Sequence, residues 1–389
     1  MWRVLLSIVW LSCYVSGIAQ AESETPNSEI RLVKSLQAIN ENQLDAALDE
    51  VDSLVQAYPN FKLAQLVKGD LLMAHAGAID SFGNVRNAPP DKILGLRDEA
   101  RMRLQRVLSQ SDSQLAPSYL WQLNSTQKYA LVVDTSRSTL YVYENVAGEA
   151  RYVTDFYITI GKLGTEKFIE GDQRTPIGVY FVEAHHPGSK LADLYGNGAY
   201  PISYPNEWDQ KHKKTGSGIW LHGSPSDTYS RPPRDSNGCV VLSNEDLDRL
   251  APYLQVGITP IIITNSMSWR DDNHQKERTA LTQSIEQWRA DWSSLDTEAY
   301  LSHYTTDFSS SNKDFNSWSE RKRWVNSNKS WINVDLENIS MITYPNQPGL
   351  VVVNFEQNYR SNNLSSKLKK RQYWIKRDNQ WKIIYEGAA

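Results

Sequence analysis

Apolar side chains recur at a helical spacing over the first part of the chain. Between residues 28 and 110 they fall three or four positions apart, as in Leu44, Leu48 and Val51, which places them on one face of an α-helix. Pro59 separates two such stretches, and a third follows the polar turn at Pro89-Pro90. The pattern predicts helices up to about residue 110, followed by linker-like residues between 117 and 126, with the boundary of the helical segment near residue 125.

The period of the pattern changes to two from Lys128 onward. Runs rich in β-branched and aromatic residues, each bounded by turn residues, predict strands. The expected strands cover residues 129–134, 139–143, 152–160, 178–182, 219–221, 240–242 and 258–264. Ser243 is expected to cap a short helix that reaches Leu250, with Asp246 completing a capping box. The middle of the chain is therefore predicted to be largely β.

A long amphipathic helix followed by alternating runs is predicted from Met267 onward. Leu281, Ile285, Trp288 and Trp292 lie on the apolar face of this helix. The expected strands cover residues 332–342, 350–359, 372–376 and 381–385. A helix followed by a meander of strands is typical of an α+β domain.

The length of the chain and these changes of pattern together predict several domains. A chain of 389 residues exceeds what one hydrophobic core usually organises, and 40% hydrophobic with 22% charged residues is typical of folded protein. The expected units are an export signal over residues 1–21, a helical segment over 22–125, a β-rich domain over 126–266 and an α+β domain over 267–389. Residues 43–76 resemble one tetratricopeptide-type hairpin.

The first residues have the pattern of a cleavable export signal. Arg3 precedes the apolar run 4–18, and Ala19-Gln20-Ala21 supplies the small residues that precede a cleavage site. The run is shorter than the roughly 20 apolar residues that span a bilayer. We therefore expect cleavage before Glu22, a periplasmic location and no stable membrane insertion of the mature chain.

The net charge argues against nucleic-acid binding, and the placement of the histidines argues against a metal site. The net charge is −4 and the pI is near 6.0, so the chain as a whole offers no attraction to nucleic acid. The basic stretch 367–377 is interpreted as protection of an exposed strand edge rather than a polymer-binding surface. His185 and His186 have no Asp, Glu or Cys at ligand spacing, so neither a metal nor an organic cofactor is expected. The sequence sets no oligomeric state.

The candidate chemistry lies where two predicted strands end and begin. His222 lies in the run Ile219–Gly223, which ends one predicted strand, and Cys239, the only cysteine left after removal of the signal, lies in the run Ser236–Val240, which opens another. A thiol is only slightly ionised at neutral pH, so it needs an imidazole that accepts its proton or forms a thiolate–imidazolium pair. Gly238 allows close approach of a substrate, and the Cys239 N–H with its neighbours is suited to an oxyanion. These residues predict acyl transfer, whereas the alternative is a buried, inert cysteine.

These motifs resemble the L,D-transpeptidase catalytic domain family (YkuD/ErfK type), in which His-Gly is followed by Ser-x-Gly-Cys. Here Cys239 follows His222 by 17 positions, and Thr175-Pro-Ile-Gly178 is similar to a second family element. The resemblance implies that Cys239 is the nucleophile, His222 the general base and the Gly223 carbonyl the group that orients the imidazole. It also implies a site wall formed by Ser236, Asn237 and Gly238. Residues 267–389 resemble an NTF2-like (SnoaL-like) domain.

The chain departs from the family pattern at two positions that bear on substrate recognition. Many members have His at the position of Asn237 and Arg at that of Val241. Arg231 and Arg234 in the intervening loop are candidates to replace the missing cation by binding a peptide carboxylate, against the alternative that both are simply solvated. Tyr200 is a further candidate for substrate binding, against the alternative of a core position.

The resemblance implies an enzyme that acts on peptidoglycan tetrapeptide stems. Attack of an amine on the acyl-enzyme would give a 3→3 cross-link, and attack of water would be an L,D-carboxypeptidase reaction. The three-part arrangement is also similar to cell-shape L,D-carboxypeptidases of curved bacteria. Further alternatives are making or cutting a link between peptidoglycan and a lipoprotein, and a non-catalytic wall-binding protein.

Overall fold

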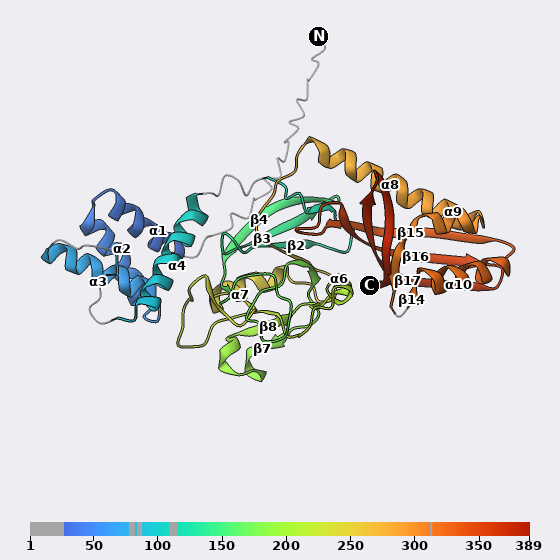
Figure 1. Cartoon of the computed structure of the whole chain (residues 1–389). Helices are drawn as coiled ribbons and strands as arrows, with labels where there is room; N and C mark the ends of the chain where they lie inside the picture. The colour runs from blue at the N-terminus through green and yellow to red at the C-terminus, as the bar shows by residue number, and fades with distance from the viewer. Residues whose placement is uncertain (1–26, 78–81, 84–87, 109–114, 312) are drawn as a thin grey trace, which may run out of the picture.

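The computed structural model shows the three predicted parts of the chain (Figure 1). It describes residues 27–389 except 78–81, 84–87, 109–114 and 312, so the expected export signal lies outside the described residues. The helical part lies at one end, the β-rich part in the middle and the C-terminal α+β part at the other end, which confirms the predicted fold class. Within the described ranges, no helix is both long and apolar enough to cross a membrane.

The helical segment has its own apolar core. Its helices are α1 (Asn27–Asn40), α2 (Leu44–Ala57), α3 (Lys62–Ala76) and α4 (Pro90–Leu108). Leu32, Val51, Phe61 and Val67 are buried between them, as expected from the helical spacing of the apolar residues. The predicted break at Pro59 falls between α2 and α3.

The middle part is built from two main sheets. The five-stranded sheet has the order β4-β3-β2-β12-β6 and the four-stranded sheet the order β11-β9-β8-β7, while β10 pairs with β5. The strands are β2 (Tyr129–Asp134), β3 (Thr139–Val146), β4 (Glu149–Tyr157), β5 (Ile160–Gly161), β6 (Gly178–Phe181), β7 (His186–Pro187), β8 (Gly198–Pro201), β9 (Trp220–His222), β10 (Arg234–Ser236), β11 (Val240–Val241) and β12 (Pro260–Thr264), and the helices are α6 (Glu207–Lys211) and α7 (Asn244–Leu250). The predicted strands of this region are thus present, with small differences at their ends.

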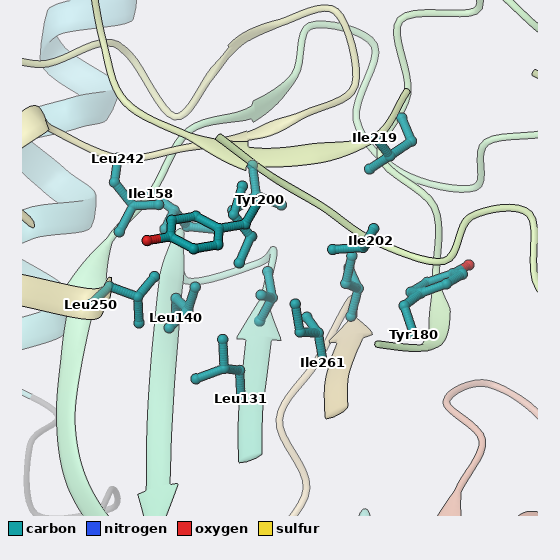
Figure 2. Close-up of a cluster of buried hydrophobic side chains, with 14 of the residues drawn as sticks. Leu131, Leu140, Ile158, Tyr180, Tyr200, Ile202, Ile219, Leu242, Leu250 and Ile261 are labelled. Carbon is teal, nitrogen blue, oxygen red and sulfur yellow. The ribbon is translucent and has the colours of Figure 1, made fainter. Parts of the chain in front are cut away.

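The five-stranded sheet is covered on both faces, and this explains why β2, β12 and β6 are buried at almost every position. In β2, Leu131 and Val133 pack into the core beneath the four-stranded sheet, and Figure 2 shows Leu131 and Leu140 pointing toward Tyr200 of that sheet. The alternate residues Ala130 and Val132 pack with Val352 and other residues of the C-terminal domain. Successive side chains of a strand point to opposite faces, so the middle and C-terminal parts share a continuous apolar interface.

The C-terminal part is a seven-stranded sheet with the order β1-β15-β16-β17-β18-β13-β14, covered by helices. Its elements are α8 (Asp272–Ser293), α9 (Thr297–Ser302), β13 (Tyr304–Ser310), β14 (Lys313–Asp314), α10 (Phe315–Ser327), β15 (Ile332–Thr343), β16 (Leu350–Ser361), β17 (Leu364–Arg377) and β18 (Gln380–Ala388). The edge strand β1 (Leu120–Gln122) corrects the sequence analysis, which treated residues 117–126 as a linker. It pairs antiparallel with β15, with Leu120 opposite Ile342.

The basic stretch on β17 is largely neutralised by ion pairs. Lys367 lies 2.9 Å from Glu356, Lys370 lies 3.4 Å from Glu386 and Arg371 lies 3.0 Å from Glu207. Lys376 and Arg377 are likewise paired with acidic residues. This charge balance favours the interpretation as strand surface over a site for an anionic polymer.

Candidate active site

Two neighbouring strands bring the predicted nucleophile and base to one face of the four-stranded sheet. β9 and β11 run parallel, with Leu221 opposite Val240 and His222 opposite Val241. Leu221 and Val240 are fully buried and point into the core. Because side chains alternate along a strand, His222 and Trp220 point away from that core, and so does Cys239, two residues before Val241.

The imidazole of His222 is held as a neutral base. His222 is only 4% exposed, and its Nδ1 lies 2.7 Å from the carbonyl oxygen of Gly223. Burial lowers the pKa of His222 to about 4, and the positive charge of Arg231 lowers it further, against the opposing effect of the Gly223 hydrogen bond. When Nδ1–H donates to that carbonyl, Nε2 carries the free lone pair that can accept a proton.

The thiol of Cys239 is protonated in this environment. Cys239 is partly exposed, and its Sγ lies 3.5 Å from the carbonyl oxygen of Gly218. Burial raises the pKa of the Cys239 thiol, while a backbone hydrogen bond at Trp220 and the charges of Arg231 and Lys167 act in the opposite direction. With the lowered pKa of His222, these shifts favour a neutral thiol beside a neutral imidazole over a thiolate–imidazolium pair.

The turn before the nucleophile is fixed by the side chain of Ser236. Its Oγ donates to the Cys239 carbonyl at 2.6 Å and accepts from the Gly238 N–H at 3.1 Å. Ser236 is 3% exposed, so it shapes the turn from inside. Asn237 is exposed. Within the described part of the chain the Cys239 N–H has no hydrogen-bond acceptor, which leaves it available to an oxyanion.

Only glycine fits at position 238. Its φ of +123° is one that residues with a side chain rarely adopt, and a Cβ there would lie 2.8 Å from the Arg174 carbonyl oxygen. Thr175 holds the same turn, since its Oγ1 donates to the Gly238 carbonyl at 2.9 Å and accepts from the Gly161 N–H at 2.9 Å. Sequence reasoning noted the Thr-Pro-x-Gly element but gave Thr175 no role, because the contact joins segments 63 residues apart.

Tyr195 packs beside His222 and forms an aromatic pair with Trp220. The Tyr195 ring is 5.1 Å from the imidazole and 4.8 Å from the Trp220 ring. Trp220 could have been found from strand alternation, since it lies two residues before His222 on the same face. Tyr195 comes from a separate loop, and no local pattern places it there.

The candidate substrate-binding residues separate into three cases. Tyr200 is 7% exposed and lies in the core, where its ring stacks on His185 at 4.6 Å, which favours the core alternative. Arg231 is occupied by Asp235, with Nε 3.0 Å from Oδ2. Arg234 is exposed on β10 and has no ion-pair partner among the described residues. Of these two arginines, Arg234 is therefore the one whose guanidinium is left free to bind an anion.

The histidine pair makes aromatic contacts. His186 lies 5.7 Å from the Trp220 ring, and His185 stacks on Tyr200. Across the described ranges, no group of three or more His, Cys, Asp and Glu side chains is arranged to hold a metal ion.

Comparisons with known proteins agree with this arrangement. Residues 128–263 match the L,D-transpeptidase catalytic domain family, YkuD, and residues 280–387 match the Cds6 C-terminal NTF2-like domain.

Among solved structures, the chain is similar to Bd1075 of Bdellovibrio bacteriovorus, with 31% identity and a TM-score of 0.62, covering 71% of this chain and 98% of Bd1075. It is also similar to the helical cell shape determining protein Pgp2 of Campylobacter jejuni, with 25% identity and a TM-score of 0.60, covering 72% of this chain and 99% of Pgp2. No curated protein matches it significantly. The chain therefore belongs to the L,D-transpeptidase (YkuD) family and carries an NTF2-like domain in its C-terminal part.

Proposed function

We propose that the protein is a peptidoglycan-modifying cysteine enzyme in which Cys239 forms an acyl-enzyme with a tetrapeptide stem. The observation that carries this proposal is the neutral His222, whose Nδ1 is held by Gly223 on the same sheet face as Cys239. A buried base with one nitrogen fixed and the other free is what a protonated thiol needs for attack on a carbonyl.

The proposed first half-reaction gives each of these groups a role. His222 Nε2 takes the thiol proton as Cys239 Sγ attacks the carbonyl carbon between meso-diaminopimelate and terminal D-Ala. The Cys239 N–H meets the oxyanion of the tetrahedral intermediate. When the C–N bond breaks, His222 returns the proton to the amine of the leaving D-Ala, and a thioester remains on Cys239.

The acceptor of the acyl group decides between two reactions. We favour water, which releases a tripeptide stem and makes the protein an L,D-carboxypeptidase in cell-shape control. This choice is supported by the similarity over nearly the whole length of Pgp2, a protein described as determining helical cell shape. Transpeptidation by an amine of a second stem is the second candidate, supported by the catalytic domain family.

The proposed function also sets a location and a division of the chain. The YkuD family acts on peptidoglycan, which implies an extracytoplasmic location, and we propose that residues 1–21 are the export signal. We propose domain boundaries near residues 125 and 266. Strand β1 lies just before the first boundary but pairs with β15 in the sheet of the C-terminal domain.

The test is product analysis with purified disaccharide-tetrapeptide. Residues 22–389 and the matched Cys239→Ala variant are incubated with the substrate, and the products are identified by mass spectrometry. Tripeptide that depends on Cys239 supports carboxypeptidation, and cross-linked dimers that depend on Cys239 support transpeptidation. Equal turnover by both chains would refute the proposed nucleophile.

A further inference from the structure

The loop that joins the candidate base to the candidate nucleophile leaves the catalytic domain and docks on the helical segment. At its tip, the Tyr229 ring lies 4.7 Å from the Tyr58 ring and 4.6 Å from the Phe61 ring. The Tyr229 hydroxyl donates to Ser28 Oγ at 2.6 Å. The side chain thus belongs to the apolar core of the helical segment, although the residue lies between His222 and Cys239 in the sequence.

The next residue enters a buried network of charges. Ser230 Oγ donates to Glu99 at 2.7 Å and accepts from the guanidinium of Arg103, both on α4. Arg103 is 2% exposed, pairs with Glu99 at 3.0 Å and with Glu29 of α1, and its guanidinium lies 4.0 Å above the Tyr157 ring. These partners fix the orientation of the planar Arg103 guanidinium, which can therefore define the position of the Ser230 hydroxyl that it binds.

A second buried pair joins the same helix to the catalytic domain. Arg106 of α4 pairs with Asp155 of β4 and, at 3.2 Å, with Glu29. Replacing buried ion pairs by apolar residues is often neutral or stabilising, so their presence is weak evidence for a role in stability and better evidence for a defined arrangement.

A short path leads from Ser230 to the nucleophile. The Arg231 carbonyl accepts from the Tyr157 hydroxyl at 3.0 Å, and the Arg231 guanidinium binds Asp235. Asp235 directly precedes Ser236, whose hydroxyl fixes the turn at Cys239. Hydrogen bonds and an ion pair hold the chain between Ser230 and Ser236, so a shift of Ser230 would displace the turn that presents Cys239.

We infer that the helical segment positions the catalytic loop, and that Arg103, acting through Ser230, is a positioning residue for the acyl transfer. This inference rests on the proposed function, because it assigns Arg103 and Ser230 to the alignment of Cys239 with His222. Neither residue touches the reacting atoms.

The test compares Ser230→Ala with Arg101→Ala. Arg101 lies on the same helix, in an exposed ion pair with Asp98 at 2.9 Å, and is the matched control. Ser230→Ala is expected to lower kcat about tenfold with little change in KM, since small misplacements of reacting groups are costly. Ser230→Thr, which keeps a hydroxyl, should restore most of the rate, and Arg103→Lys, which keeps the charge without the fork, should behave like Ser230→Ala.

A second readout does not depend on the substrate. The rate of alkylation of Cys239 by iodoacetamide is measured against pH in each variant. Burial is the main cause of the raised thiol pKa, so a loosened loop in Ser230→Ala should move the midpoint of the profile to lower pH, while Arg101→Ala leaves it unchanged. An unchanged profile and unchanged kcat in Ser230→Ala, or the same shift in Arg101→Ala, would overturn the positioning role. Absence of turnover in the unmodified chain would overturn the proposed function alone, because the alkylation profiles still decide the inference.

Discussion

At the scale of single residues, the candidate site depends on how burial sets protonation. The same burial that raises the pKa of Cys239 lowers that of His222 to about 4. A resting ion pair is therefore disfavoured, and the base must take the proton during attack. The Gly223 carbonyl contributes by fixing which imidazole nitrogen is free.

The pH dependence of kcat/KM follows from His222. Only the neutral imidazole can accept the thiol proton, so activity is lost as pH falls through the pKa of His222. We expect this acid limb near pH 4 rather than near the ordinary value of 6.5. Steady-state rates with the tetrapeptide between pH 3.5 and 8, at about unit spacing or finer, locate the limb. A limb close to 6.5 would show that His222 is solvated or is not the base.

Gly238→Ala tests the turn that presents Cys239. The new methyl group meets the Arg174 carbonyl in a backbone conformation unfavourable for alanine, so we expect turnover to fall by about a hundredfold as the turn moves. Gly257→Ala is the control, because Gly257 also has positive φ, +76°, but has open space around it. The rates and melting temperatures of both variants are compared, and equal loss of activity in the two would contradict a specific role for the turn.

At the scale of elements, α6 is fixed by a cap that also joins two domains. The Asn206 side chain accepts from the Asp209 N–H at 2.8 Å and donates to the Val179 carbonyl at 2.9 Å and to the Tyr344 hydroxyl at 3.1 Å. Asn206 is 4% exposed. One side chain therefore connects α6, β6 and the C-terminal domain.

Asn206→Ala is expected to cost about 2 kcal/mol of unfolding free energy, because it removes a helix cap and leaves buried partners unsatisfied. The exposed cap Asp314, which accepts from the Ser317 N–H at 2.9 Å, is the comparison. Asp314→Ala should cost only about 1 kcal/mol, since it loses the cap alone. Denaturant unfolding measures both, and a smaller loss for Asn206→Ala than for Asp314→Ala would contradict the bridging role.

Periodicity predicted most elements, but contacts between distant segments could not be read from the sequence. The strands 129–134 and 260–264 follow from β-branched runs. Ser243 caps α7 as predicted, with its Oγ accepting from the Asp246 N–H at 3.1 Å, whereas the Asp246 carboxylate binds Arg249 and does not complete the predicted capping box. The three-residue strand β1 escaped detection because its partner Ile342 lies far along the chain. His222 and Cys239 stand out by chemistry, whereas Tyr195 and Thr175 join the site only through tertiary packing.

At the scale of the whole molecule, the catalytic domain is built between two neighbours. The helical segment binds the loop between His222 and Cys239, and the C-terminal domain covers the far face of the five-stranded sheet. The face of the five-stranded sheet that packs on the C-terminal domain is therefore apolar, and the catalytic domain needs that neighbour to cover it.

A chain that ends at residue 266 should not fold into a soluble protein. Its loss of the C-terminal domain would expose Val132, Tyr141 and Ile262, which are at most 5% exposed in the full chain, as one apolar patch of the kind that leads to aggregation. Size-exclusion chromatography and thermal unfolding of residues 22–266 and 22–389 make the comparison. A monomeric short chain with cooperative unfolding would contradict the shared interface.

The central claim is an acyl-enzyme on Cys239, and intact-protein mass spectrometry of residues 22–389 shortly after mixing with disaccharide-tetrapeptide tests it most directly. The account predicts a mass increase equal to the mass of the disaccharide-tetrapeptide minus that of one D-alanine, located on Cys239 by peptide mapping and absent from Cys239→Ala. Turnover without an adduct on Cys239, or the same adduct in the alanine variant, would contradict it.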